Sequence, residues 1–125
     1  MKLYKIQESL YQFLSKNLSV PVENRIDLDT PKPYVAMADI NLRRENARKL
    51  EGFNLVQELV VFSNFNGKDE VIKITDEIRE LVSEYEIEIE NVNVHTQTIS
   101  SIAISQFDVK IYEGQIMLNL EIFEY

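Results

Sequence analysis

Two stretches of the chain repeat their apolar residues with the period of an α-helix. The first covers residues 3–14, and Pro21 cannot continue it, so we expect this helix to end near residues 17–19. The second follows Asn66 and Gly67, and Asn66 is predicted to cap its N-terminus. Its apolar residues are Val71, Ile74, Ile78, Leu81, Val82 and Tyr85. We therefore expect each helix to bury one apolar face.

Other stretches alternate apolar and polar residues, which is typical of strands. They are residues 34–42, 53–65, about 93–105 and 115–123, with a shorter extended segment within 20–28. In the first, the alternation places one set on a common face, namely Tyr34, Ala36, Ala38, Ile40 and Leu42. The second is apolar on both faces towards its C-terminal end, which predicts that it lies centrally in the sheet or partly under a neighbouring subunit.

The predicted order of elements is α–β–β–β–α–β–β. Two amphipathic helices and one sheet bury their apolar surfaces most simply when both helices pack on the same face. The pattern therefore predicts a two-layer α+β fold with a mixed or antiparallel sheet. The 125 residues suffice for an autonomous core, and we expect a single domain over 1–125.

A basic segment connects the first two long strands. Residues 43–52 are ten residues, long for a hairpin connection, and they contain four basic side chains, namely Arg43, Arg44, Arg48 and Lys49. Two interpretations remain open: a solvated hairpin tip, or a contact with another protein. Glu45 and Glu51 interrupt the basic residues and no aromatic side chain stacks among them, so a groove for single-stranded nucleic acid fits poorly.

Charge divides the chain into two unequal halves. Residues 1–67 carry nine basic and eight acidic side chains, whereas residues 68–125 carry four and thirteen, which makes the net charge −8. The acidic half would repel the phosphates of DNA. It also complements the basic segment 43–49, so a neighbouring copy of the chain offers a matching surface. A head-to-tail contact of that kind closes into a ring if the rotation permits.

The search for catalytic chemistry finds little. The chain has no cysteine and one histidine, which excludes disulfides, zinc–thiolate sites and histidine cages. The three glycines are scattered at expected turns, so no phosphate-binding loop exists: Gly52, Gly67 and Gly114. His95 is expected on an exposed strand. No window approaches the ~20 apolar residues of a membrane span, and no signal peptide is visible. We expect a soluble protein that is not an enzyme and uses no cofactor or metal.

Four glutamates alternate with apolar residues after the second helix, namely Glu84, Glu86, Glu88 and Glu90. Alternation of this kind is what a half-buried strand needs, so a solvated face is the first interpretation. An acidic interface or pore wall is the second, and a metal or catalytic site the third. Val92 and Val94 have the opposite parity, which predicts a bulge or turn near Glu90-Asn91.

The layout as a whole has a known counterpart. An N-terminal helix with Ile6, Leu10-Tyr11 and Leu14 precedes Arg25-Ile26 and a strand that opens Pro33-Tyr34-Val35. The most telling part is residues 55–82, where the strand Val56–Ser63 runs through Asn66-Gly67-Lys68 into a helix. Two strands end the chain. This pattern resembles the tail-completion family of long-tailed bacteriophages and prophages, also called tail terminator or head-to-tail joining proteins, over nearly the whole chain.

The resemblance implies a structural role without catalysis. Members form a hexameric ring on the head-proximal end of the tail tube, stop tube growth and join the head connector, or stopper, protein. DNA passes through the lumen without specific binding. The resemblance thus implies a virion component, located at the head–tail interface and made in a bacterial host cytoplasm. Within it, the connection 42–53 is where subunits meet, so Arg43, Arg44, Arg48 and Lys49 are the predicted interface residues.

Other functions stay open at the level of sequence. Another tail or connector subunit of the same fold would show the same pattern. A small regulatory or ligand-binding α+β domain is a second class. An enzyme is the third, with His95 and the glutamates of residues 84–90 as its only conceivable groups.

Overall fold

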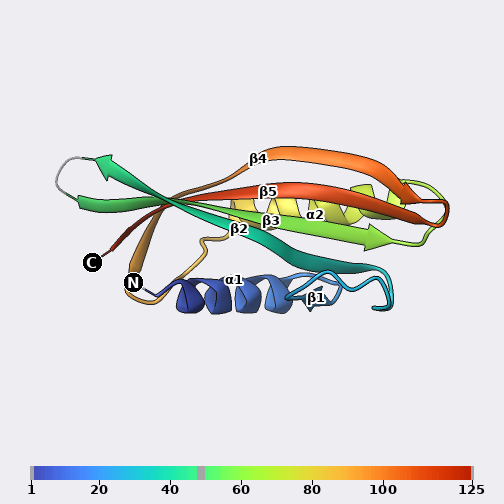
Figure 1. The fold of residues 1–125 in the computed structure, drawn as a ribbon, viewed down its shortest axis with the longest axis horizontal. Coiled ribbons are helices and arrows are strands. Elements are labelled where there is room, and N and C mark those ends of the chain that lie inside the picture. The colour runs from blue at the N-terminus through green and yellow to red at the C-terminus, as the bar shows by residue number, and fades with distance from the viewer. Residues whose placement is uncertain (1, 48–49, 125) are drawn as a thin grey trace.

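The computed structural model describes residues 2–47 and 50–124, and the predicted order of elements is confirmed (Figure 1). The elements are α1 (Leu3–Asn17), β1 (Val22–Glu23), β2 (Tyr34–Ala47), β3 (Leu50–Ser63), α2 (Asp69–Glu84), β4 (Val92–Asp108) and β5 (Ile111–Glu124). The strands form one mixed sheet in the order β1-β2-β3-β5-β4. β1 and β2 are parallel, and the other pairs are antiparallel. β3 lies at the centre, as its two apolar faces predicted.

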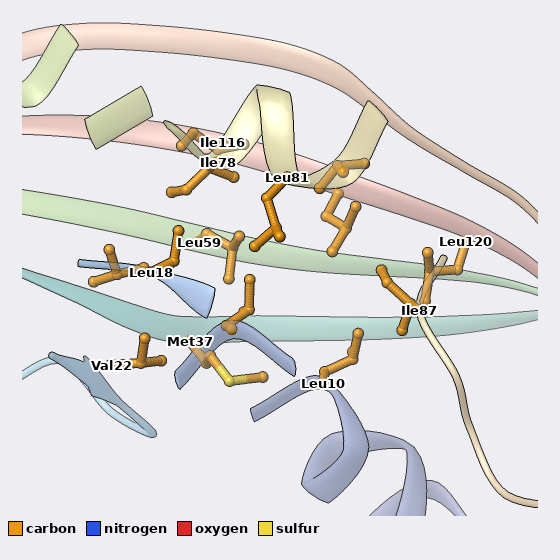
Figure 2. Close-up of a cluster of buried hydrophobic side chains, with 14 of the residues drawn as sticks. Leu10, Leu18, Val22, Met37, Leu59, Ile78, Leu81, Ile87, Ile116 and Leu120 are labelled. Atoms are coloured by element: carbon orange, nitrogen blue, oxygen red, sulfur yellow. The ribbon is translucent and has the colours of Figure 1, made fainter. Parts of the chain in front are cut away.

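Both helices pack on the same face of the sheet, so the two-layer α+β fold is confirmed. One cluster of buried side chains joins the apolar face of each helix to the inward residues of β2, β3 and β5 (Figure 2). Leu10 of α1, Ile78 of α2 and Leu118 of β5 are fully buried. Burial of a side chain of this size contributes about 1.5–3 kcal/mol relative to exposure, so this cluster is the main source of stability.

A bulge in β2 corrects the predicted face of this strand. The register with β3 shifts between Met37 and Ile40, and the parity of the side chains reverses there. Ile40 and Leu42 therefore pack on the helix side, whereas Tyr34 and Ala36 lie on the opposite face. The prediction that all of them share one face was wrong. Alternation cannot reveal a bulge when both faces are apolar.

Gln57 of β3 lies opposite the bulge in β2, where it pairs with Ile40. Its side chain is completely buried on β3, and its Nε2 donates to the carbonyl oxygens of Ala38 and Asp39, each at 3.4 Å. The same Nε2 lies 2.8 Å from the carbonyl oxygen of Glu58. Two of these bonds connect Gln57 to the backbone of Ala38 and Asp39, where the pairing of β2 and β3 is irregular.

A second, smaller cluster lies on the helix-free face of the sheet. The Tyr34 and Phe62 rings stack with their centroids 5.3 Å apart, and Phe107 meets Phe62 edge-on at 6.1 Å. The Tyr34 hydroxyl donates to the carbonyl oxygen of Asp27 at 2.8 Å, which ties the β1–β2 connection over this cluster. Burial raises the pKa of Tyr34 above the ordinary value for tyrosine.

Three local predictions were wrong. Lys68, not Asn66, occupies the N-cap of α2, and no side chain bonds to that helix end. Gly114 lies inside β5 and Gly52 inside β3, and both are buried close-approach positions, not turns. Gly67 is the glycine that serves a turn, with φ at +118°, a left-handed conformation that favours glycine.

The segment after α2 is extended but is not a strand of the sheet. Ile87 and Ile89 are buried and the glutamates between them are exposed, as the alternation predicted. The predicted break is present: Asn91 has φ at +61°. Gln97 of β4 holds the segment, because its Nε2 donates to the carbonyl oxygen of Val82 at 2.7 Å and its Oε1 accepts from the Ile87 amide at 2.9 Å.

Candidate subunit interfaces

The predicted basic loop is mostly strand. β2 continues to Ala47 and β3 begins at Leu50, so the connection is two residues long and not ten. The prediction failed because the charged residues 43–45 interrupt the apolar alternation by which a strand is recognised in a sequence, so this part of β2 resembles a loop. Arg43 and Arg44 are exposed on β2, opposite Asn54 and Phe53 respectively. Arg48 and Lys49 lie outside the described residues.

We call the paired residues 43–47 and 50–54 the hairpin arm. The arm extends beyond both helices at one end of the molecule (Figure 1). Consecutive strand residues point to opposite faces, so Arg43 and Arg44 do not form one basic patch. Phe123 lies against Gly52, where a Cβ atom would be 2.7 Å from its ring. This ring braces the base of the arm and holds it in line with the sheet.

β4 forms one edge of the sheet and is almost without charge. Its 17 residues contain one charged side chain, Asp108 at its C-terminal end, although charged residues make up 27% of the chain. Among the described residues, no strand pairs with its outer side. Soluble proteins normally block a long edge with lysine, proline or buried charges, because exposed backbone donors and acceptors pair with other chains. β4 has no lysine or proline, and its irregularities are three register shifts in its pairing with β5, between Val94 and Thr96, Ile99 and Ser101, and Gln106 and Asp108. The regular segments between these shifts have no charge that would oppose pairing with another strand.

The opposite side of the sheet is open as well. β1 covers only Val35 and Ala36 of β2, and no described strand pairs with the outer side of β2 from Met37 to Ala47. One sheet therefore presents two unpaired edges on opposite sides. A contact between the β4 edge of one copy and the β2 edge of the next is heterologous, and such contacts form rings when the rotation closes.

The candidate chemical groups are not gathered into a site. No group of three or more His, Asp or Glu side chains could hold a metal ion within residues 2–47 and 50–124. His95 is exposed on β4, where its ring meets the Phe123 ring edge-on at 5.9 Å. Glu86, Glu88 and Glu90 point to solvent. In the described part of the chain, no helix is long and apolar enough to cross a membrane.

The uncharged edge is the feature that sequence reasoning missed. The sequence does show that residues 92–107 contain no lysine, arginine, aspartate or glutamate. It does not show that this strand lies at the edge of the sheet, because β5 lies between β3 and β4 and the strand order differs from the order along the chain.

Comparison with known proteins reveals a shared fold. No family model matches the sequence, and no curated protein matches it. A chain in the solved structure of the virion of a native gene transfer agent particle superposes with a TM-score of 0.80. The match covers 96% of this chain and 96% of that chain at 8% sequence identity. The two chains therefore share the complete fold, from α1 to β5.

Proposed function

We propose that this chain is a structural component of a phage or phage-like particle, and specifically a tail-completion protein. In this role it forms a hexameric ring at the head-proximal end of the tail tube, stops tube growth and joins the tail to the head connector. The observation that carries the proposal is the match over nearly the full length of both chains to a chain in a gene transfer agent virion. The resemblance of residues 55–82 to the tail-completion family is the reason for proposing tail completion among the roles of virion components.

The two open sheet edges support assembly into a ring. The β4 edge offers backbone groups flanked by Ser, Thr, Gln and Ile side chains, without a charge that another strand would have to bury. The β2 edge begins at Met37, includes the bulge and continues into the hairpin arm. In a ring joined by these edges, Arg43 and Arg44 lie at the subunit boundary, which is the role proposed for the basic residues.

The helix-free face of the sheet suits a passage for DNA. Register with β3 and β5 places Glu58, Glu113 and Glu121 on this face, among neutral residues such as Asn119. Among the residues that the structure describes, the same register places one basic residue there, Arg43 of the hairpin arm, so acidic residues predominate. Carboxylates repel phosphates, and neutral amides make no strong ionic contact with them. We propose that this face lines the lumen, so that DNA moves past it without specific binding.

The test is a reconstitution with tail tubes made in the absence of this chain. Purified protein is added to the tubes, and electron microscopy records their ends. The proposal predicts a ring bound at one end of each tube and no binding of duplex DNA by the isolated protein. A monomer in solution agrees with the proposal, because the tube end can trigger assembly. Tubes that remain uncapped at saturating protein would contradict it.

A further inference from the structure

The end of the molecule opposite the hairpin arm gathers exposed apolar side chains. The β1–β2 connection, the β3–α2 turn and the β4–β5 turn all lie at this end (Figure 1). Phe65 is 52% exposed, Phe107 49% and Val109 83%. Isolated exposed apolar residues need no explanation, but several on neighbouring connections mark an interaction surface.

A cavity of about 450 Å³ opens between these three connections. Phe65, Val109, Ile111 and Tyr112 give it an apolar lining, and residues from each connection contribute to the wall. This volume falls within the range of about 300–1,000 Å³ that is usual for binding pockets, and it is sufficient for a large side chain of a partner. We call this cavity the loop-end pocket.

The polar lining of the loop-end pocket is entirely donor-bearing. Lys32 and Lys110 line it together with two asparagines, and no acidic residue does so, although acidic residues outnumber basic ones by 21 to 13 in the chain. The Lys32 Nζ donates to the carbonyl oxygens of Leu28 at 2.6 Å and Thr30 at 3.4 Å. These two bonds hold the ammonium group in place and leave its third donor for a ligand.

We propose that the loop-end pocket binds a segment of a different protein, one that presents an apolar side chain beside a carboxylate. The apolar lining takes the side chain, and the ammonium groups of Lys32 and Lys110 pair with the carboxylate. The inference rests on the proposed function and deepens it, because it names the surface by which the ring binds its neighbour along the particle axis.

A second copy of this chain is a poorer occupant. The open edges of β2 and β4 run along the sides of the sheet, so copies joined by them leave the loop end uncovered. A copy seated in the loop-end pocket would instead be displaced along the strands. Repetition of that contact gives an open stack without closure, which is incompatible with a part that ends tube growth.

Two variants and two matched controls test the inference. Phe65→Ser removes an exposed aromatic ring from the loop-end pocket, and Tyr11→Ser removes one that is 39% exposed from α1. Lys110→Glu reverses a pocket charge, and Lys16→Glu reverses an exposed charge on α1. Circular dichroism and thermal unfolding establish that each variant is folded, and Lys110→Glu on an exposed turn keeps the test available if Phe65→Ser is unstable.

The assay adds each purified protein to an extract that contains heads and tails made without this chain. Electron microscopy counts rings on tails and joined particles. We expect both pocket variants to form rings on tails at the wild-type level and to reduce joining to heads at least tenfold, while the controls behave as wild type. Normal rings with normal joining would overturn the inference. Loss of rings on tails in the pocket variants alone would also overturn it, since the pocket would then be needed for assembly on the tube. Failure of the wild-type protein itself would contradict the proposed function instead.

Discussion

Replacement of Gly114 by alanine tests how closely α2 approaches β5. Gly114 is buried in β5 directly beneath α2. A Cβ atom there would lie 2.8 Å from Cγ1 of Val71 and 3.3 Å from Oγ1 of Thr75. Both contacts belong to buried, β-branched side chains, which have few alternative rotamers. The new methyl group can therefore be accommodated only if the helix moves away from the sheet.

The expected cost combines two opposing effects. Overpacking of a well-packed core costs about 1–3 kcal/mol. Alanine also restricts the unfolded chain relative to glycine, which stabilises by about 0.4–1 kcal/mol. The two ranges combine to a net loss of about 0–2.6 kcal/mol in the free energy of unfolding. We expect about 1–2 kcal/mol for Gly114→Ala, because the contact with Val71 at 2.8 Å excludes the low end of the range. For a domain of this size, this loss lowers the Tm by roughly 3–10 °C.

Urea and thermal unfolding of four proteins measure the effect. They are the wild type, Gly114→Ala, Val71→Ala and the double variant. Val71→Ala removes the closest contact, so the alanine methyl at position 114 then occupies the space that Val71 leaves. We expect the double variant to lose clearly less stability than the sum of the two single losses. Additivity within about 0.3–0.5 kcal/mol, or an unchanged Gly114→Ala variant, would refute the packing argument.

Three further predictions concern the helix-free face, the β4 edge and the hairpin arm. Tyr34→Phe removes the hydrogen bond to Asp27 and should cost about 0.5–1.5 kcal/mol in urea unfolding at pH 7. Burial raises the pKa of Tyr34, so its contribution to the free energy of unfolding is complete below tyrosine's ordinary pKa of about 10 and is lost as the pH rises through the raised value. The stability difference between wild type and Tyr34→Phe should therefore shrink at alkaline pH. A difference that grows with pH would contradict this sign. Ser101→Lys on β4 should prevent the formation of rings on tube ends, as seen by electron microscopy, whereas the control Gln115→Lys, on the same face of β5, should not. Equal effects of the two variants would exclude pairing at the β4 edge. Arg43→Glu should weaken ring formation at least severalfold without lowering the Tm by more than 1–2 °C, and unchanged assembly would remove the arm from the interface.

The layers of the fold follow from periodicity in the sequence. The apolar residues of α1 and α2 recur with helical spacing, and each helix buries that stripe against the sheet, except at its outer end, where Leu3 and Tyr85 are exposed. Ile116, Leu118, Leu120 and Ile122 alternate along β5, and all four are completely buried. In each case one face meets the core and the other meets solvent, so the sequence pattern carries the information.

Features that depend on neighbouring elements were not predictable. Ile40 and Leu42 face the helices because of the bulge in β2, and Gln57 of the neighbouring strand β3 bonds to the backbone at that bulge. Gly114 resembles a turn residue in the sequence, and only its position beneath Val71 explains the glycine. In the hairpin arm, the charged residues 43–45 interrupt the alternation of β2. The proposed interface is therefore a sheet edge that ends in a charged ribbon, and not a long basic loop.

The central claim is that this chain ends the tail tube and joins it to the head. The most direct test is electron microscopy of particles assembled in cells that lack only this chain, with the chain restored from a plasmid as the control. The account predicts tails of irregular, extended length and DNA-filled heads without tails, both corrected by the plasmid. Tails of normal length joined to heads in the absence of the chain would contradict it.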